Sequence, residues 1–318
     1  MHFPTIGDFY QRLLFLLPFS ANLLPEGLRF SYDEPQQWRH IYPQCGGSYQ
    51  SPIALNSRKA IPISLPPLNF GHYEEPFDEL LSVRNNGHTG MYKAAGNMHY
   101  IFKEYPVIFT VEFRVPTTVL GERPYLTGGL LGDFYEAMAV HFHWGSSQRK
   151  GSEHLLNGRR YDLEMHIVHR NTNYQSDEEA RNQTDGLAVL AVLFKVVRTN
   201  YPHYQPGLSE ILGSLLHLGD FNSSYTPAAF LTLGSLLGNL DRGNFYAYRG
   251  SLTTPPCSPA VLWHVFAEVL PISQLELPKF WQLRDRRGRP LLNTFRPVQS
   301  LEGRQVFQRR PPSEYIWL

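Results

Sequence analysis

The chain has few cysteines, almost no net charge and no apolar run long enough to cross a membrane, and each shortage excludes a class of protein. Two cysteines, without a Cys-x-x-Cys pair, cannot close a cysteine-rich structural zinc site. The formal net charge of +1 lacks the basic excess of a nucleic-acid-binding surface. We therefore expect neither a nucleic-acid partner nor a transmembrane span.

Several functional motifs are also missing. The sequence has no glycine-rich phosphate loop, no dinucleotide fingerprint, no nucleophile elbow and no internal repeat. Its 42% hydrophobic and 18% charged residues are typical of a globular protein. An aromatic share of 14%, with 25 Gly and 25 Pro, favours strands joined by turns over long helices.

Short β-type runs separated by Gly, Pro and Asn clusters recur along one uniform region. We expect strands at Leu81–Asn85, His99–Phe102, Val107–Phe113, Ala137–Trp144, Glu164–His169, Leu187–Val197 and Ala260–Leu270. Helical segments are expected to be minor, chiefly Leu208–Leu218 and Ala228–Leu237. This pattern predicts a mainly β (α+β) single domain over residues 28–311, with a large, mostly antiparallel central sheet and a few short peripheral helices.

The two ends of the chain carry separate expectations. Leu13–Leu24 is apolar, follows Arg12 and resembles a signal-peptide core, so residues 1–27 are either a signal peptide or an apolar N-terminal segment. Residues 312–318 form a C-terminal tail without a hydrophobic lipid-anchor signal. Asn182-Gln-Thr and Asn222-Ser-Ser are glycosylation acceptors, compatible with a secreted protein.

Three histidines have the spacing of a metal site. His141 and His143 are alternate residues of an expected strand, so they share one face and Phe142 points to the other. His166 lies in a second expected strand and shares a face with Glu164, whereas His169 has the opposite parity. If the two strands pair as antiparallel neighbours, three imidazoles can converge on one point.

Zinc suits such a set best, because three neutral nitrogens leave a tetrahedral ion with one open position, which is the catalytic arrangement. The alternatives are that the three histidines are buried core residues without a metal or that His-x-His belongs to a cupin-like metal protein. The glutamate that usually follows in the latter is absent from Trp144 to Gln148.

Seven motifs in order carry a family resemblance. They are Gln50-Ser51-Pro52-Ile53, Asn85-Asn86-Gly87-His88, His141 to Gly145, Gly151-Ser152-Glu153-His154, Glu164 to His169, Ser251 to Pro256 and Arg296-Pro297-Val298-Gln299. From Tyr32 to Arg309 the chain resembles the α-class carbonic anhydrases. The resemblance implies zinc-dependent, reversible hydration of carbon dioxide to bicarbonate and a proton, with His141, His143 and His166 as zinc ligands.

The same resemblance implies further roles. Glu164 would accept the free N–H of His166 and fix its tautomer. Thr253 would accept a hydrogen bond from zinc-bound hydroxide while donating to Glu153. His88 would shuttle the proton to buffer, since histidine titrates near neutral pH, and Tyr32 and Asn86 would order the connecting water. The apolar wall that holds carbon dioxide would comprise Val168, Val189, Leu252, Thr253, Thr254, Val261 and Trp263.

Ala139 departs from the family pattern, and the two cysteines match it. The family commonly has Gln two residues before the first ligand, bonded to that histidine, whereas this chain has Ala139; loss of such a partner can cost about 10- to 100-fold in metal affinity or activity. Spacing alone does not pair Cys45 with Cys257, and two free buried thiols are the alternative. They fall where secreted family members form a disulfide, so the resemblance implies a disulfide-bonded, secreted, extracellular protein.

Two readings of the function remain on this fold. An active enzyme is expected because all three ligand histidines are present, whereas catalytically silent binding modules of the family typically lose one. The expected partner is therefore the small-molecule substrate, carbon dioxide or bicarbonate, and Zn²⁺ is the expected cofactor. The sequence says nothing about the oligomeric state.

Overall fold

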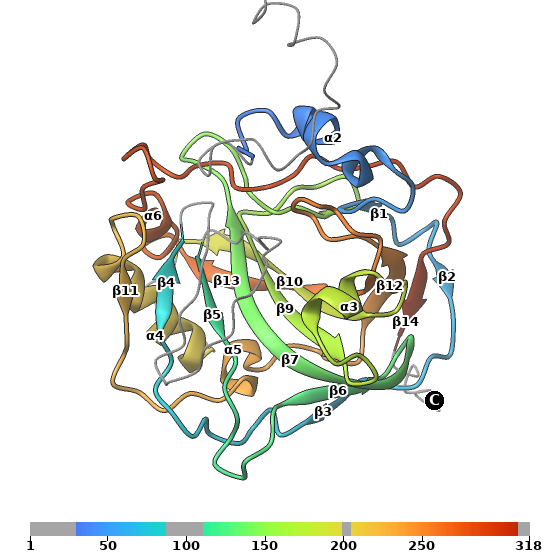
Figure 1. The fold of residues 1–318 in the computed structure, drawn as a ribbon, viewed down its shortest axis with the longest axis horizontal. Helices are drawn as coiled ribbons and strands as arrows, with labels where there is room; N and C mark the ends of the chain where they lie inside the picture. The colour runs from blue at the N-terminus through green and yellow to red at the C-terminus, as the bar shows by residue number, and fades with distance from the viewer. Residues whose placement is uncertain (1–29, 87–110, 199–204, 311–318) are drawn as a thin grey trace, which may run out of the picture.

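A computed structural model describes residues 30–86, 111–198 and 205–310 of the chain. The predicted strand His99–Phe102, His88 and the two terminal segments lie outside these residues. The described chain is organised around one large twisted sheet with short helices around it (Figure 1). The prediction of a mainly β fold with a large central sheet is confirmed.

Within the described residues the sheet has 12 strands, and ten of them follow the order β11-β4-β5-β7-β9-β10-β13-β12-β14-β2. β6 pairs with β7 and β3 pairs with β6. The pairings are antiparallel except β10–β13 and β14–β2. The strands are β2 (Ile61–Pro62), β3 (Asn69–Gly71), β4 (Val83–Asn85), β5 (Val111–Arg114), β6 (Tyr125–Gly128), β7 (Leu131–Trp144), β9 (Leu163–Asn171), β10 (Leu187–Val197), β11 (Ser224–Tyr225), β12 (Phe245–Gly250), β13 (Val261–Ser273) and β14 (Phe307–Arg309).

The remaining elements are short. β1 (Ala54–Leu55) and β8 (Leu155–Leu156) form a separate two-stranded sheet. The α-helices are α2 (Trp38–Ile41), α3 (Asp177–Arg181), α4 (Pro206–Ser214), α5 (Gly234–Leu237) and α6 (Leu277–Phe280). The 3₁₀ helices are η3 (Pro35–Gln37), η4 (Pro43–Gly46) and η5 (Leu215–His217). Within the described ranges, none of these helices has the length and apolar character needed to cross a membrane.

The two faces of the sheet have different cores. β10 reads as an almost continuous apolar run because both of its faces are covered. Its even-numbered residues Ala188 to Phe194 join the large core with α4 and α5. Its odd-numbered residues Val189 to Leu193 join a smaller core with Leu252 and Trp263. The face of the sheet that carries the smaller core also carries the histidine site.

Tertiary contacts changed two predicted elements. β7 begins at Leu131 rather than Ala137, because the added residues pair with β6 beyond a register shift at Ala137 and Ala139. The predicted helix Ala228–Leu237 is wrong for residues 228–233. There the backbone bonds to a neighbouring loop: the Phe77 N–H donates to the Leu231 carbonyl, and the Gly234 N–H donates to the Tyr73 carbonyl.

The large-core side of the sheet also holds two buried histidines. His169 Nε2 lies 2.5 Å from the Tyr73 hydroxyl oxygen, and His264 Nε2 accepts the Leu130 N–H at 3.2 Å. Burial lowers the pKa of His169 to about 3 and that of His264 to about 4. In the folded protein both imidazoles therefore stay neutral at pH values well below the ordinary pKa of histidine.

Because of these two histidines we expect the folded protein to lose stability at acidic pH. Because the unfolded chain binds their protons below about pH 6.5 and the native chain binds them only near pH 3–4, stability falls as pH falls through this window. His264→Gln keeps an acceptor for Leu130 but does not titrate. Between pH 6.5 and 4, thermal melts should show a smaller decrease in Tm for this variant, by the equivalent of at most about 3 kcal/mol. If Tm falls equally with pH in His264→Gln and in the unmodified chain, the low pKa of His264 does not contribute to the loss of stability.

A candidate metal centre and its cavity

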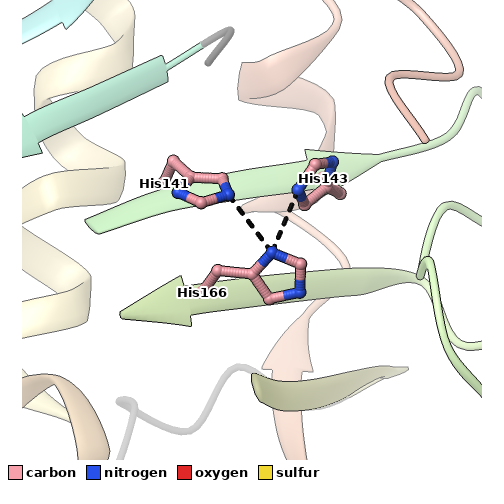
Figure 2. A group of neighbouring side chains, drawn as sticks. All are labelled: His141, His143 and His166. Carbon is pink, nitrogen blue, oxygen red and sulfur yellow. Dashed lines mark hydrogen bonds between the residues drawn. The ribbon is translucent and has the colours of Figure 1, made fainter. Parts of the chain in front are cut away.

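The antiparallel pairing of β7 with β9 creates the histidine site. His141 lies directly opposite His166, and His143 lies opposite Glu164. Alternate residues of β7 point to opposite faces, so Phe142 enters the large core while both histidines face the smaller one. Figure 2 shows the three rings converging from the two strands. His169, after the register shift, is on the other face, as its parity predicted.

The three inner nitrogens are close together and buried. His166 Nδ1 lies 3.1 Å from His143 Nε2 and 3.2 Å from His141 Nε2. The three side chains are at most 3% exposed. Ligands bound to tetrahedral zinc at 2.0–2.1 Å lie about 3.3 Å apart, so the spacing of these nitrogens fits the first coordination shell of that ion.

The outer nitrogens determine the tautomers of two rings. His143 Nδ1 lies 2.7 Å from the Thr294 carbonyl oxygen, which can only accept, so Nδ1 carries the proton. His166 Nε2 lies 2.6 Å from Glu164 Oε1 and donates to that carboxylate. The inner nitrogens, His143 Nε2 and His166 Nδ1, are then both lone-pair donors at 3.1 Å. Two such donors repel one another unless a cation binds between them.

A proton is a poor candidate for that cation. Burial is the largest effect on the pKa of each ring, and it lowers the pKa of His141 and His166 and brings that of His143 to about 4. The imidazoles are thus neutral at physiological pH, the form in which histidine binds metals. The donor set of three neutral nitrogens fits Zn²⁺ in a site with an open position.

Glu164 organises the hydrogen bonds behind the histidine triad. Its Oε1 accepts from His166 Nε2 and from His154 Nδ1, at 2.6 and 2.7 Å, and its Oε2 accepts the backbone N–H groups of Glu153 and His154 at 2.7 and 2.8 Å. Burial raises the pKa of this carboxyl, but the two histidines and these hydrogen bonds outweigh burial and hold it well below its usual value. Glu164 is therefore a carboxylate.

His154, Glu164 and His166 also place three possible ligand atoms within 4.8 Å. Here, however, both rings donate their protons to Glu164, so this cluster is a hydrogen-bond network rather than a second metal site. No role for His154 is predicted from the sequence. Its other nitrogen lies 2.7 Å from the Tyr248 hydroxyl oxygen, so it bridges two strands.

Glu153 lies between the histidines and the loop that follows β12. Its Oε1 accepts the Arg296 N–H at 2.8 Å, and its Oε2 lies 3.4 Å from His143 Nε2. Burial raises its pKa to about 7, while hydrogen bonds from Arg296 and from the Thr253 side chain lower it. The Thr253 side chain is therefore close to the Glu153 carboxyl.

The triad opens onto a small, mainly apolar cavity. Its lining consists of His141, His166, Val168, Val189, Leu252, Thr253, Thr254 and Trp263. Six of the residues predicted for the substrate wall are in this set. Val261, the seventh, is fully buried at the start of β13, opposite Gly250, and is not among the residues that line the cavity. It shares a face with Trp263 but lies farther toward the end of the strand, where it packs in the smaller core.

Tyr32 and Asn86, predicted to order water between the metal and His88, are both buried. Tyr32 is 9% exposed, packs with Trp38 and the cysteine pair, and is close enough to Glu153 for that carboxylate to raise its pKa after burial. Asn86 is buried directly after β4. His88 lies outside the described residues.

A disulfide connects η4, which contains Cys45, to the loop that carries Thr253. Cys45 and Cys257 are bonded, with Cα atoms 4.9 Å apart, so the pairing implied by the resemblance is confirmed. The buried guanidinium of Arg296 supports the same junction by donating to the carbonyls of Cys45 and Ser51 and to the side chain of Gln50. These contacts bring together motifs that are more than 200 residues apart.

Comparisons with known proteins agree with this geometry. The family model of eukaryotic-type carbonic anhydrase matches residues 33–310. Carbonic anhydrase 15 of Mus musculus is 34% identical over 279 residues, which cover 86% of this chain and 78% of the relative. Carbonic anhydrase 6 of Homo sapiens is 35% identical over 282 residues (87% and 81%), and carbonic anhydrase 12 of Homo sapiens is 33% identical over 288 residues (87% and 71%).

Proposed function

The chain belongs to the eukaryotic-type carbonic anhydrase family, and we propose that it is an active zinc enzyme that reversibly hydrates carbon dioxide to bicarbonate and a proton. The observation that carries this proposal is the convergence of three buried imidazoles on one point at the end of an apolar cavity. Membership of this family also rejects the cupin-like alternative.

The proposed residue roles follow from the contacts. His141, His143 and His166 would hold Zn²⁺, which when bound supplies the Lewis acidity that makes water a nucleophile near neutral pH. Thr294 and Glu164 hold two of the rings in the tautomer that a metal requires. Val168, Val189, Leu252 and Trp263 offer carbon dioxide an apolar surface beside the triad.

Thr253 would orient the attacking oxygen. If its hydroxyl donates to the nearby Glu153, as we propose, its oxygen lone pairs remain to accept a hydrogen bond from the nucleophile. This arrangement would aim a nucleophile lone pair at the substrate carbon. The released proton must then leave the site, and we propose His88 as its shuttle, with Tyr32 and Asn86 ordering the intervening water.

The primary test is zinc content together with stopped-flow hydration of carbon dioxide by the purified full chain. About one zinc per chain with hydration well above the buffer rate is expected. Zinc without hydration would identify a catalytically silent binding module instead. Absence of both would remove the proposal.

Thr253→Ala tests the orienting role. This variant should keep its zinc but lower hydration turnover about 10²-fold, as loss of one preorganised hydrogen-bond partner does in other enzymes. Thr253→Ser retains the hydroxyl and is the matched control, with most of the activity preserved. Unchanged turnover in Thr253→Ala would show that the relay to Glu153 does not orient the nucleophile.

We also propose that the protein is secreted and glycosylated. The disulfide is the kind of bond that persists in an oxidising compartment. Both acceptor asparagines, Asn182 and Asn222, are exposed, as glycan attachment requires.

A further inference from the structure

Three neighbouring turns carry six cations for which the proposed reaction has no use. Two of the cations follow β1, two lie in the loop between β7 and β8, and two follow the turn of Asn157 and Gly158 after β8. Five of the side chains are exposed, and the sixth, that of Arg160, is half-buried. We call this set the basic surface; it consists of Arg58, Lys59, Arg149, Lys150, Arg159 and Arg160.

Hydrogen bonds hold the three turns side by side. β1 and β8 pair in parallel, so the segments that follow them leave the pairing at the same end. The Asn157 side chain accepts from the Ser57 N–H and hydroxyl at 2.9 and 3.0 Å. The Gly151 N–H donates to the Tyr161 carbonyl at 2.9 Å. Because only six residues connect Gly151 to Asn157, at most about 22 Å separates the two junctions, and the six cations belong to one stretch of surface.

Two guanidinium groups of the basic surface share one aromatic ring. The guanidinium carbon of Arg149 lies 4.8 Å from the centroid of the Phe295 ring, and that of Arg160 lies 4.5 Å from it. Arg160 also donates a hydrogen bond to the Ser152 carbonyl, so the folded chain holds its fork in place. The two positive charges lie within about 10 Å of one another, which is the Debye length at about 0.1 M salt, so salt does not fully screen their repulsion. An anion bound between them would relieve it.

Few carboxylates offset these charges. Within the described residues the basic surface forms one ion pair, in which Lys150 Nζ lies 3.3 Å from Asp162 Oδ2. Burial lowers the pKa of Arg160, and the charges of Glu153 and Glu164 raise it, so both carboxyl groups attract this guanidinium from the interior. Both are fully buried and hydrogen bonded within the histidine site, so neither reaches the surface. The outer side of the turns is therefore positive on a chain whose net charge is only +1.

The chemistry of the basic surface fits a polymer that carries sulfate groups. Guanidinium forks bind sulfate and phosphate oxygens in pairs, and lysine adds point charges. Cations on three turns suit a ligand with repeated charges better than one small ion. Nucleic acid is disfavoured because the chain as a whole lacks a basic excess and Phe295, 3% exposed, offers no face on which a base could stack. A secreted protein, as proposed above, meets sulfated polysaccharides instead.

We propose that the basic surface binds a sulfated polysaccharide, with Arg149 and Arg160 at the centre of the contact. None of the six cations, all of them in the described ranges, lines the cavity beside the histidine triad. Binding would therefore tether the protein to the polysaccharide and leave the cavity open. This inference rests on the proposed secretion and is independent of the proposed hydration of carbon dioxide.

The test is retention of the purified full chain on immobilised heparin at about 0.15 M NaCl, the physiological ionic strength. The unmodified chain should be retained on heparin and should pass through a column of desulfated heparin. Arg149→Gln/Arg159→Gln removes one cation from each of two turns and should weaken heparin binding in solution about tenfold through loss of two charge-assisted contacts. Arg286→Gln/Arg287→Gln removes two exposed arginines from a turn outside the basic surface and is the charge-matched control. It should bind heparin almost as tightly as the unmodified chain.

The remaining outcomes separate this inference from its alternatives. Passage of the unmodified chain through the heparin column would overturn it. Equal weakening in the two double variants would also overturn it, because binding would then follow overall charge. Tighter binding to single-stranded DNA than to heparin would identify a nucleic-acid surface instead. Retention on heparin by a chain that hydrates no carbon dioxide would support this inference and remove the proposed function.

Discussion

His166→Ala is expected to yield a protein that purifies without zinc and hydrates carbon dioxide no faster than buffer. His166 Nδ1 lies 3.1 Å from His143 Nε2 and 3.2 Å from His141 Nε2, so it is central to the proposed ligand set. Removing it leaves two imidazoles, too few for the three-ligand arrangement of a catalytic zinc site. The same change deprives Glu164 of one of its buried donors. We expect a loss of hydration activity of at least about 10³-fold, with zinc content below about one tenth per chain.

His217→Ala is the matched control for this experiment. His217 is exposed on η5 and stacks on Tyr225, with ring centroids 4.0 Å apart. Its replacement therefore leaves the contacts of the histidine triad unchanged. It should retain both zinc and activity. Circular dichroism and the Tm of metal-free His166→Ala would show whether the variant folds. A folded His166→Ala protein with full zinc content would remove this residue from the ligand set.

Removal of the disulfide should produce the largest change in stability. The bond closes a loop of 212 residues between Cys45 and Cys257. In the chain-entropy model a loop of this length restricts the unfolded chain by about 5 kcal/mol. For a domain of this size that corresponds to a decrease in Tm of about 8–10 °C in the Cys45→Ser/Cys257→Ser double variant.

Chemical reduction provides the control for the disulfide. A reductant should lower the Tm of the unmodified chain to that of the double variant and leave the double variant unchanged. Activity should also fall, because Cys257 immediately follows the loop of Thr253 and Thr254, where its N–H donates to the Thr254 carbonyl at 2.9 Å. A double variant that melts within about 2 °C of the unmodified chain would contradict the entropic account.

Local periodicity was sufficient to predict several elements correctly. The strand Leu187–Val197 has the bounds that its apolar run predicted. α4 and η5 cover most of the predicted helix Leu208–Leu218, with Pro206 at the first turn, where its missing N–H is tolerated. By contrast, the segment from Ala228 to Leu233 has helical composition, but its hydrogen bonds to residues 73–77 take the place of helical ones.

What the sequence alone determined about the site was the parity of its side chains. Alternation along a strand has a period of two, so His141 and His143 had to share a face and His169 had to leave it once the strands paired. Nothing local indicated which residues would be opposite them. The register that places His166 against His141 and Glu112 beside it depends on the packing of both cores, because a shift of one residue would exchange the two faces.

Tertiary structure alone decided the groups that support the ligands. The acceptor for His143 is a backbone carbonyl 151 residues away, and every residue carries such a carbonyl, so the side-chain sequence cannot mark it. His154 acquires its place between Glu164 and Tyr248 only when β9 and β12 are held in the same sheet. Residue identity therefore determines which atoms can bind a metal, whereas the tautomers that turn their lone pairs inward depend on partners that only the folded chain brings within hydrogen-bond distance.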